Sequence, residues 1–151
     1  MIIVPGDFAD PQIIQLLHLH VERARSASPP CSSHALEPTG LQAPDISFWA
    51  AWEADRLLGV GALREIASDH GEVKSMHTAG VARRTGVGTA ILRHIIATAR
   101  RRGYSKLSLE TGASDYFAAA QALYEQHGFT RGGRFGDYRV DPNTVFMHLE
   151  L

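Results

Sequence analysis

The feature that most restricts the fold is the stretch RRTGVG at residues 83–88. It follows the strand-like run EVKSMHT (72–78) and opens a helix-like run in which Val87, Ile91 and Ile95 recur at helical spacing. A glycine-rich turn between a strand and a helix directs several backbone N–H groups and the positive end of the helix dipole at one point. The sequence therefore predicts a strand–turn–helix unit that can bind an anion.

Two common phosphate-binding loops do not match this turn. A Walker loop needs four residues between its glycines and a Lys-Ser or Lys-Thr pair after them. The dinucleotide fingerprint needs a third glycine at the position of Ile91. Short glycine turns also join strands to helices only because the backbone needs a positive φ, so a purely structural role stays open.

The remaining patterns predict a single domain of mixed α/β architecture over residues 1–151, because a chain of this length that is 44% hydrophobic can bury one core. In chain order we expect a strand at 1–6, a helix from Asp10 to about Ser26, an irregular segment at 27–45, two strands within 46–66 around a turn at 53–56, a loop at 67–71, a strand at 72–78, a helix at 87–102, a strand at 106–111, a helix at 117–127, and strands at 129–135 and 144–151. The centre of this order is a βαβ unit.

Composition narrows the class of partner. The formal net charge of −1 indicates no broad basic surface, so we expect neither nucleic acid nor a membrane as a partner. Cys31 is the only cysteine, which indicates an inert thiol and a reducing, cytoplasmic location. The histidines do not combine with Cys or carboxylate residues at ligand spacing, so no metal site is expected.

Two motifs resemble those of the GNAT superfamily of N-acetyltransferases. Arg83, Gly86 and Gly88 match the family's acyl-CoA loop, Q/R-x-x-G-x-G/A, in register, and ALYEQHGF at 122–129 resembles its Leu-Tyr-x-x-x-Gly-Phe helix end. The resemblance covers roughly residues 45–151. It implies a GNAT-like acyl-CoA N-acyltransferase fold: a mostly antiparallel central sheet with a parallel βαβ core, flanked by helices, as in small bacterial acetyltransferases.

The resemblance also implies a reaction and a cosubstrate. An acetyl group would pass from acetyl-CoA to a primary amine of a small molecule, peptide or protein by direct attack on the thioester. The residues that would contact acetyl-CoA are Met76, His77, Thr78, Arg83, Arg84, Thr85, Gly86, Val87, Gly88, Thr89, Phe117 and Tyr124. Phe117 stands where many family members carry an Asn that faces the pantetheine, so the chain departs from the family there.

Candidate catalytic residues follow from the same resemblance. Tyr124 corresponds to the family's general acid near the CoA sulfur, although its helical spacing also fits a core aromatic residue. For the general base we expect Glu72 first and His77 next, since several family members place a base on this strand. In a regular strand these two residues, five apart, face opposite sides, so only one is expected to face the acceptor.

Acceptor recognition is expected from the irregular segment and the last hairpin loop, because loops vary around a fixed scaffold. The candidates are His34, Trp49, Asp137, Tyr138 and Asp141. Strand alternation puts Trp49 and Trp52 on opposite faces of the sheet. Ordinary loop capping and sheet packing remain an alternative reading of these residues.

Two other functions stay open at this point. One is a non-catalytic CoA-binding or sensing module of the same fold, and the other is a dimeric interaction protein whose glycine turn is structural. Edge strands and the apolar TVFM run (144–147) are compatible with a homodimer but do not establish it.

Overall fold

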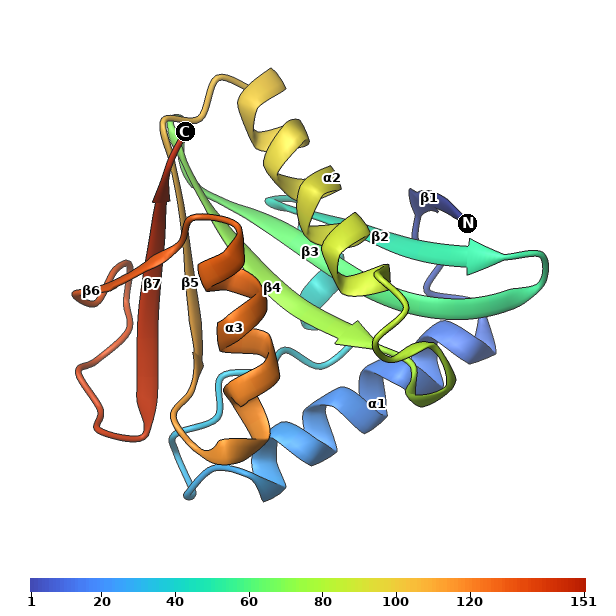
Figure 1. Ribbon diagram of the computed structural model, residues 1–151, viewed down its shortest axis with the longest axis horizontal. Helices are drawn as coiled ribbons and strands as arrows, with labels where there is room; N and C mark the ends of the chain where they lie inside the picture. Colours follow the sequence, from blue (N-terminus) through green and yellow to red (C-terminus); the bar gives the residue numbers. More distant parts are fainter.

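The computed structural model describes all 151 residues as a seven-stranded sheet flanked by three α-helices (Figure 1). The elements, in chain order, are β1 (Ile2–Pro5), α1 (Pro11–Ser26), the 3₁₀ turn η1 (Gly40–Gln42), β2 (Ile46–Glu53), β3 (Arg56–Ala67), β4 (His70–Thr78), the 3₁₀ turn η2 (Gly80–Ala82), α2 (Val87–Arg101), β5 (Lys106–Gly112), the 3₁₀ turn η3 (Asp115–Phe117), α3 (Ala118–Gln126), β6 (Thr130–Gly132) and β7 (Thr144–Glu150).

The sheet has the strand order β1-β2-β3-β4-β5-β7-β6. Every neighbouring pair is antiparallel except β4 and β5, which are parallel and joined through α2. The expected mixed α/β fold with a parallel βαβ core in a mostly antiparallel sheet is therefore confirmed.

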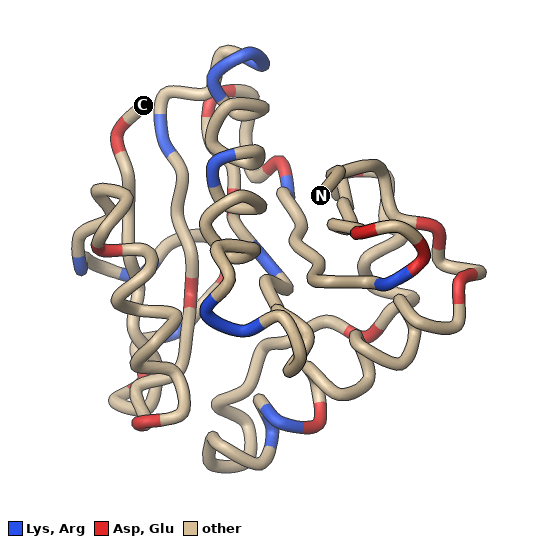
Figure 2. Tube along the Cα trace, turned by 45° about the vertical axis from the view of Figure 1, so that its right-hand side comes forward, with Lys and Arg blue, Asp and Glu red and all other residues tan.

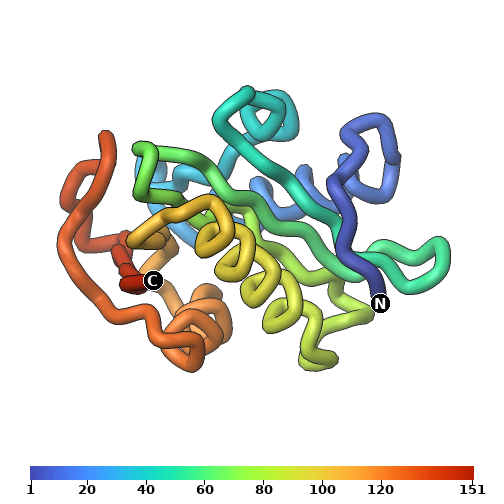
Figure 3. Tube along the Cα trace, turned by 90° about the horizontal axis from the view of Figure 1, so that it is seen from above, coloured from blue at the N-terminus to red at the C-terminus, as the bar shows by residue number.

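The helices cover both faces of the sheet. Seen from above, α1 lies on one face, and α2 and α3 lie on the other (Figure 3). Helix α1 begins where the Asp10 carboxylate accepts a hydrogen bond from the backbone N–H of Gln12, at 2.8 Å. Its buried stripe, which includes Ile13 and Leu17, packs against Leu41 of η1 and the facing side chains of β2 and β3.

Helix α2 buries the apolar face that its spacing predicts. Ile91, Leu92 and Ile95 are at most 1% exposed and belong to the larger core on the α2 face of the sheet. Gly61 of β3 permits this close approach, because a Cβ there would lie 2.6 Å from Ile91 Cγ2. This packing fixes the start of α2 against the end of β4.

Strands β4 and β5 pair only at their beginnings. Their pairing joins His70–Glu72 to Lys106–Ser108, whereas β4 continues to Thr78 and β5 to Gly112. In Figure 1 the two strands separate toward their carboxyl ends. Ligands of open α/β sheets bind at this end of parallel strands.

A bulge in β4 changes which side chains face α1. Val60 pairs with His77 and Ala62 pairs with Lys74, so β4 carries one extra residue here, and Ser75 has a φ of 55°. Because Val60 and Ala62 pack on the α1 face, their partners His77 and Lys74 face α1 too. Arg64 lies two residues beyond Ala62, so Glu72, its partner, shares that face. The expectation that Glu72 and His77 face opposite sides is wrong, because the bulge shifts the alternation by one residue.

Other element boundaries also differ from the expected ones. The loop expected at 67–71 is a tight turn, since β4 begins at His70. The strand expected at 129–135 is limited to Thr130–Gly132, because the chain then leaves the ladder and Phe135 packs against His148 and Phe146.

Charged residues of both signs are interspersed along the chain, with a basic stretch where the loop enters α2 (Figure 2). None of the helices is both long enough and apolar enough to cross a membrane.

Candidate active site

A cavity of about 820 Å³ opens where β4 and β5 diverge. Its walls come from α1, the segment 28–36, β4, the loop 82–89, β5 and the α3 region. It therefore joins the glycine-rich loop on the α2 face to side chains on the α1 face.

The loop before α2 leaves its backbone donors free. Gly86 has a φ of 87° and precedes the helix, and the first intrahelical bond runs from the N–H of Ala90 to the carbonyl of Gly86. A Cβ on Gly88 would lie 3.2 Å from Leu123 Cδ2 and 3.6 Å from Thr78 Oγ1, so this glycine keeps the approach to the first helical turn open. The loop thus has the free N–H groups that its sequence predicts.

Tyr124 of α3 lines the cavity and is 7% exposed. Its ring packs edge-on against Phe129, with centroids 5.8 Å apart. Burial, and secondarily the charge of Glu110, raises the pKa of the Tyr124 phenol. The phenol therefore stays protonated and available to a ligand.

Glu110 of β5 is a functional candidate that sequence reasoning missed. It is the one carboxylate that lines the cavity. Burial raises the pKa of Glu110 to about 7, with Lys74 opposing the shift and Glu72 and Asp141 adding to it. The one signal in the sequence is a carboxylate within the expected strand KLSLET, but its burial depends on the divergence of the strands.

Glu72 belongs to a buried network instead of the cavity wall. It is 2% exposed, and its Oε2 accepts hydrogen bonds from Lys74 Nζ at 3.2 Å and from the Tyr138 hydroxyl at 2.5 Å. Lys74 Nζ also donates to the Tyr138 oxygen at 2.8 Å. The pKa of the Tyr138 phenol is raised by burial first and by Glu72 second. This network fastens the last hairpin loop to β4.

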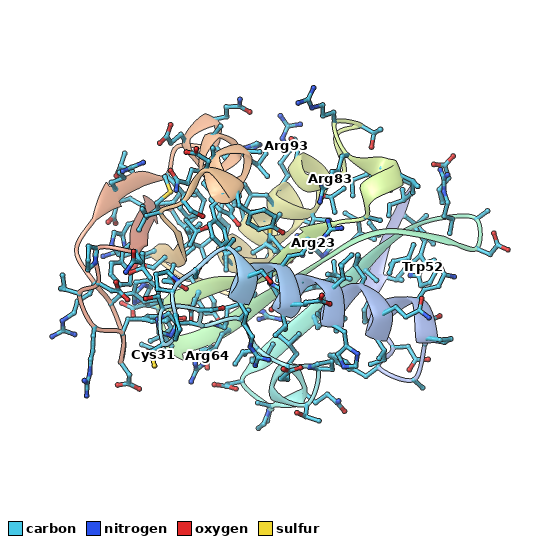
Figure 4. The ribbon with its side chains drawn as sticks, turned by 90° about the horizontal axis from the view of Figure 1, so that it is seen from below. Arg23, Cys31, Trp52, Arg64, Arg83 and Arg93 are labelled. Atoms are coloured by element: carbon cyan, nitrogen blue, oxygen red, sulfur yellow. The ribbon has the colours of Figure 1, made fainter.

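His77 lines the cavity and faces α1. Its Nδ1 lies 3.1 Å from Nδ1 of His20, so one ring donates to the other, while its Nε2 is buried without a partner. Burial, and then His20, Arg83 and Arg23, lowers the pKa of His77 to about 3, and burial lowers that of His20 to about 4. Figure 4 shows the two arginines, from α1 and from the loop, near this end of the site.

The structure brings most of the expected cofactor residues together. The following line the one cavity: Met76, His77, Thr78, Arg83, Arg84, Gly86, Val87, Gly88, Thr89, Phe117 and Tyr124. Thr85 does not line it, and its hydroxyl donates to the carbonyl of Ala82. The ring of Phe117 lies over Gly112, where a Cβ would clash with it at 2.0 Å.

The expected acceptor residues are divided. His34 lines the cavity, and its ring contacts Tyr138 edge-on with centroids 5.1 Å apart. Asp137 is exposed, and Asp141 accepts hydrogen bonds from Ser32 and Asn143 outside the cavity. Trp49 is 8% exposed and packs against His94 of α2, so it is a core residue and does not line the cavity.

Comparison with known proteins places this geometry among the acetyltransferases. The family model described as "Acetyltransferase (GNAT) family" matches residues 13–129, so the chain belongs to that family and is an acetyltransferase.

Two curated relatives are similar over nearly the whole chain. The uncharacterized N-acetyltransferase YsnE of Bacillus subtilis is 46% identical over 96% of each chain, and the uncharacterized N-acetyltransferase YedL of Escherichia coli is 43% identical over 96% of this chain and 91% of its own. A GNAT family acetyltransferase from Elizabethkingia anophelis with acetyl-CoA bound has the same fold, with a TM-score of 0.73, 18% identity, and coverage of 99% of this chain and 97% of its own.

Proposed function

We propose that this protein is an acetyl-CoA-dependent N-acetyltransferase that transfers an acetyl group directly from the thioester to a primary amine. The observation that carries the proposal is the divergence of β4 and β5, which opens one cavity onto the free N–H groups of the loop, the phenol of Tyr124 and the carboxyl of Glu110.

The loop would hold the pyrophosphate of acetyl-CoA. The N–H groups of the first turn of α2 and its dipole favour an anion, and Arg83 and Arg84 add positive charge at the cavity wall. The end of β4, from Met76 to Thr78, lines the same cavity and offers backbone groups to the pantetheine arm. The structural neighbour with acetyl-CoA bound supports this choice of cosubstrate.

Glu110 is the general base in this proposal, in place of Glu72 or His77. A pKa of about 7 leaves a substantial fraction of Glu110 ionised at neutral pH while keeping it basic enough to accept a proton from an amine, directly or through a water. Glu72 is already neutralised by Lys74 outside the cavity. His77, with a pKa of about 3, is a much weaker base.

Tyr124 is the general acid. Tyr124 lines the cavity, where its hydroxyl can donate a hydrogen bond to the departing thiolate. Burial raises the pKa of the phenol, and the same dry surroundings would raise that of the thiol, so proton transfer between them stays feasible.

The proposed step is balanced. Glu110 removes a proton from the acceptor ammonium, and the amine nitrogen forms a bond to the thioester carbonyl carbon. The carbon–sulfur bond then breaks, and the thiolate takes the phenolic proton of Tyr124. The nitrogen loses its second proton to solvent as the amide forms, and the proton on Glu110 is passed through solvent to restore Tyr124. The products are the N-acetyl amine, CoA thiol and one proton released to solvent.

The test is release of free thiol from acetyl-CoA in the presence of a panel of primary amines, for the wild type and for Glu110→Gln. We expect the log of kcat/KM of the wild type to rise with pH and level off above about 7. Glu110→Gln should lower kcat by about 100-fold or more and abolish this rise. An unchanged pH profile in Glu110→Gln would remove Glu110 from the mechanism, and no thiol release with any amine would refute the proposed function.

A further inference from the structure

Lys74 presents a buried cation to the cavity. Its side chain is 8% exposed, and Lys74 lines the cavity wall on the α1 face of β4. Two of the three hydrogens of its ammonium group are directed to Glu72 Oε2 and the Tyr138 hydroxyl oxygen. The third has no partner in the protein and is available to a ligand.

A second donor lies beside it. His34 comes from the irregular segment, lines the same cavity, and its ring contacts the Tyr138 ring edge-on, with centroids 5.1 Å apart. Lys74 also lies over the Tyr138 ring, with its Nζ 5.6 Å from the centroid. Tyr138 therefore gathers two N–H donors, from distant parts of the chain, at one end of the cavity.

The charged groups at the Tyr138 end of the cavity suit an acceptor that carries both an amine, which Glu110 can deprotonate, and an anionic group. Glu110 is the one carboxylate that lines the cavity, and it is close enough to Lys74 for the two charges to interact. Of the two other acids nearby, Glu72 is paired with Lys74 and does not line the cavity, and Asp141 has both carboxylate oxygens engaged by Ser32 and Asn143. The cavity thus offers one carboxyl group to the amine and two donors to a second group.

We propose, on the basis of the proposed function, that the acceptor is an amine that also carries a carboxylate, such as an amino acid or the end of a short peptide. The Lys74 ammonium and the His34 imidazole bind the carboxylate, and Glu110 receives the proton from the amine. Tyr138 is a positioning residue that holds Lys74 in place.

The same cation discriminates against simple polyamines. Lys74 is paired with Glu72, which does not line the cavity, so an acceptor meets the free N–H of Lys74 at this end. A carboxylate accepts a hydrogen bond from that N–H, whereas a second ammonium group has only donors and leaves it unpaired.

The test compares pairs of acceptors that differ only by the carboxylate, such as phenylalanine with phenethylamine and lysine with cadaverine. Free-thiol release from acetyl-CoA is measured for each, and we expect kcat/KM to be at least about tenfold higher for the carboxylate member, because a charge-assisted hydrogen bond is lost without it. If the wild-type enzyme shows equal or higher kcat/KM for the decarboxylated amines, the inference is overturned while the proposed function still stands.

Variants locate the selectivity. Lys74→Met removes a charge that lowers the pKa of Glu110, so it can slow both members of each pair, but it should reduce kcat/KM for the carboxylate members by at least about tenfold more than for the decarboxylated amines, so the preference disappears. Lys106→Met removes a half-buried lysine of β5 that does not line the cavity and should preserve the preference.

The outcomes separate the two proposals. Equal losses for both members of each pair in Lys74→Met would show a structural role for Lys74 and overturn the inference. If Lys74→Met does not fold, Lys74→Arg and the wild-type ratio decide, since retained charge should retain the preference. No turnover with any amine would refute the proposed function itself, and the inference with it.

Discussion

At the scale of single residues, the proposed base Glu110 and the proposed acid Tyr124 both depend on burial. Burial raises the pKa of each, which places Glu110 near neutrality and keeps Tyr124 protonated. Tyr124 could be predicted because it falls within a recognisable motif. Glu110 could not, since the solvation of a strand residue depends on how far the neighbouring strand has moved away.

The raised pKa of Glu110 makes its charge costly in the folded state. A folded pKa of about 7 against an ordinary 4.5 means that the native state binds the proton more tightly, so the free energy of unfolding falls as pH rises from about 4.5 to about 7. Glu110→Gln should therefore be more stable than the wild type at pH 8, by up to about 3 kcal/mol, and nearly equal to it below pH 4.5. Urea unfolding at pH 4.5 and pH 8 measures both values.

The matched control for this prediction is Glu125→Gln, which removes an exposed carboxylate of α3. Its stability relative to the wild type should be the same at both pH values. A Glu110→Gln variant that shows no gain at pH 8 would mean that Glu110 is not desolvated in the folded protein.

Tyr124→Phe should separate catalysis from binding. Phe keeps the ring that packs against Phe129, so the change should leave the free energy of unfolding nearly unchanged and acetyl-CoA affinity within about twofold, while kcat falls by about 100-fold. Tyr116→Phe, which changes a more exposed tyrosine lining the same cavity, should have nearly wild-type kcat. Wild-type turnover in Tyr124→Phe would exclude the proposed acid.

At the scale of elements, the sequence predicts the regular pieces well and the irregular ones poorly. The apolar periods of α1 and α2 and the capping pair Asp10–Pro11 locate two helices closely. The bulge at Ser75 has no local signal, because it is stabilised by pairing with β3. The end of β6 at Gly132 is likewise not predicted by the alternation of side chains.

At the scale of elements, the testable feature is the role of the glycine-rich loop in binding acetyl-CoA. Gly88→Val would place a branched side chain beside the first turn of α2, near Leu123 and Thr78, in the space assigned to the pyrophosphate. We expect acetyl-CoA affinity to fall by about tenfold or more, measured by calorimetry, with a small change in melting temperature because the Leu123 contact is a flexible side-chain end. Gly133→Val, at a glycine where an added Cβ meets nothing within 4 Å, should bind acetyl-CoA normally. Equal affinity in Gly88→Val and Gly133→Val would make the loop a structural turn.

At the scale of the whole molecule, one cavity gathers the loop, the α3 region, α1 and the irregular segment around the opening between β4 and β5. The fold class could be predicted because two motifs at the right separation fix the βαβ core. The acceptor wall could not, since it forms from residues 28–36, β4 and the last hairpin loop, which are far apart in sequence. Trp49 was expected to bind the acceptor but lies in the core, because an aromatic residue in a strand is as typical of a core as of a binding site.

The central claim is that this cavity binds acetyl-CoA, and isothermal titration of the purified protein with acetyl-CoA tests it most directly. Free CoA and ATP serve as parallel titrants. We predict one site per chain, with a dissociation constant between about 1 μM and 1 mM for acetyl-CoA and CoA, and no binding of ATP at that site. Absence of binding by both CoA ligands, with the protein folded, would contradict the account.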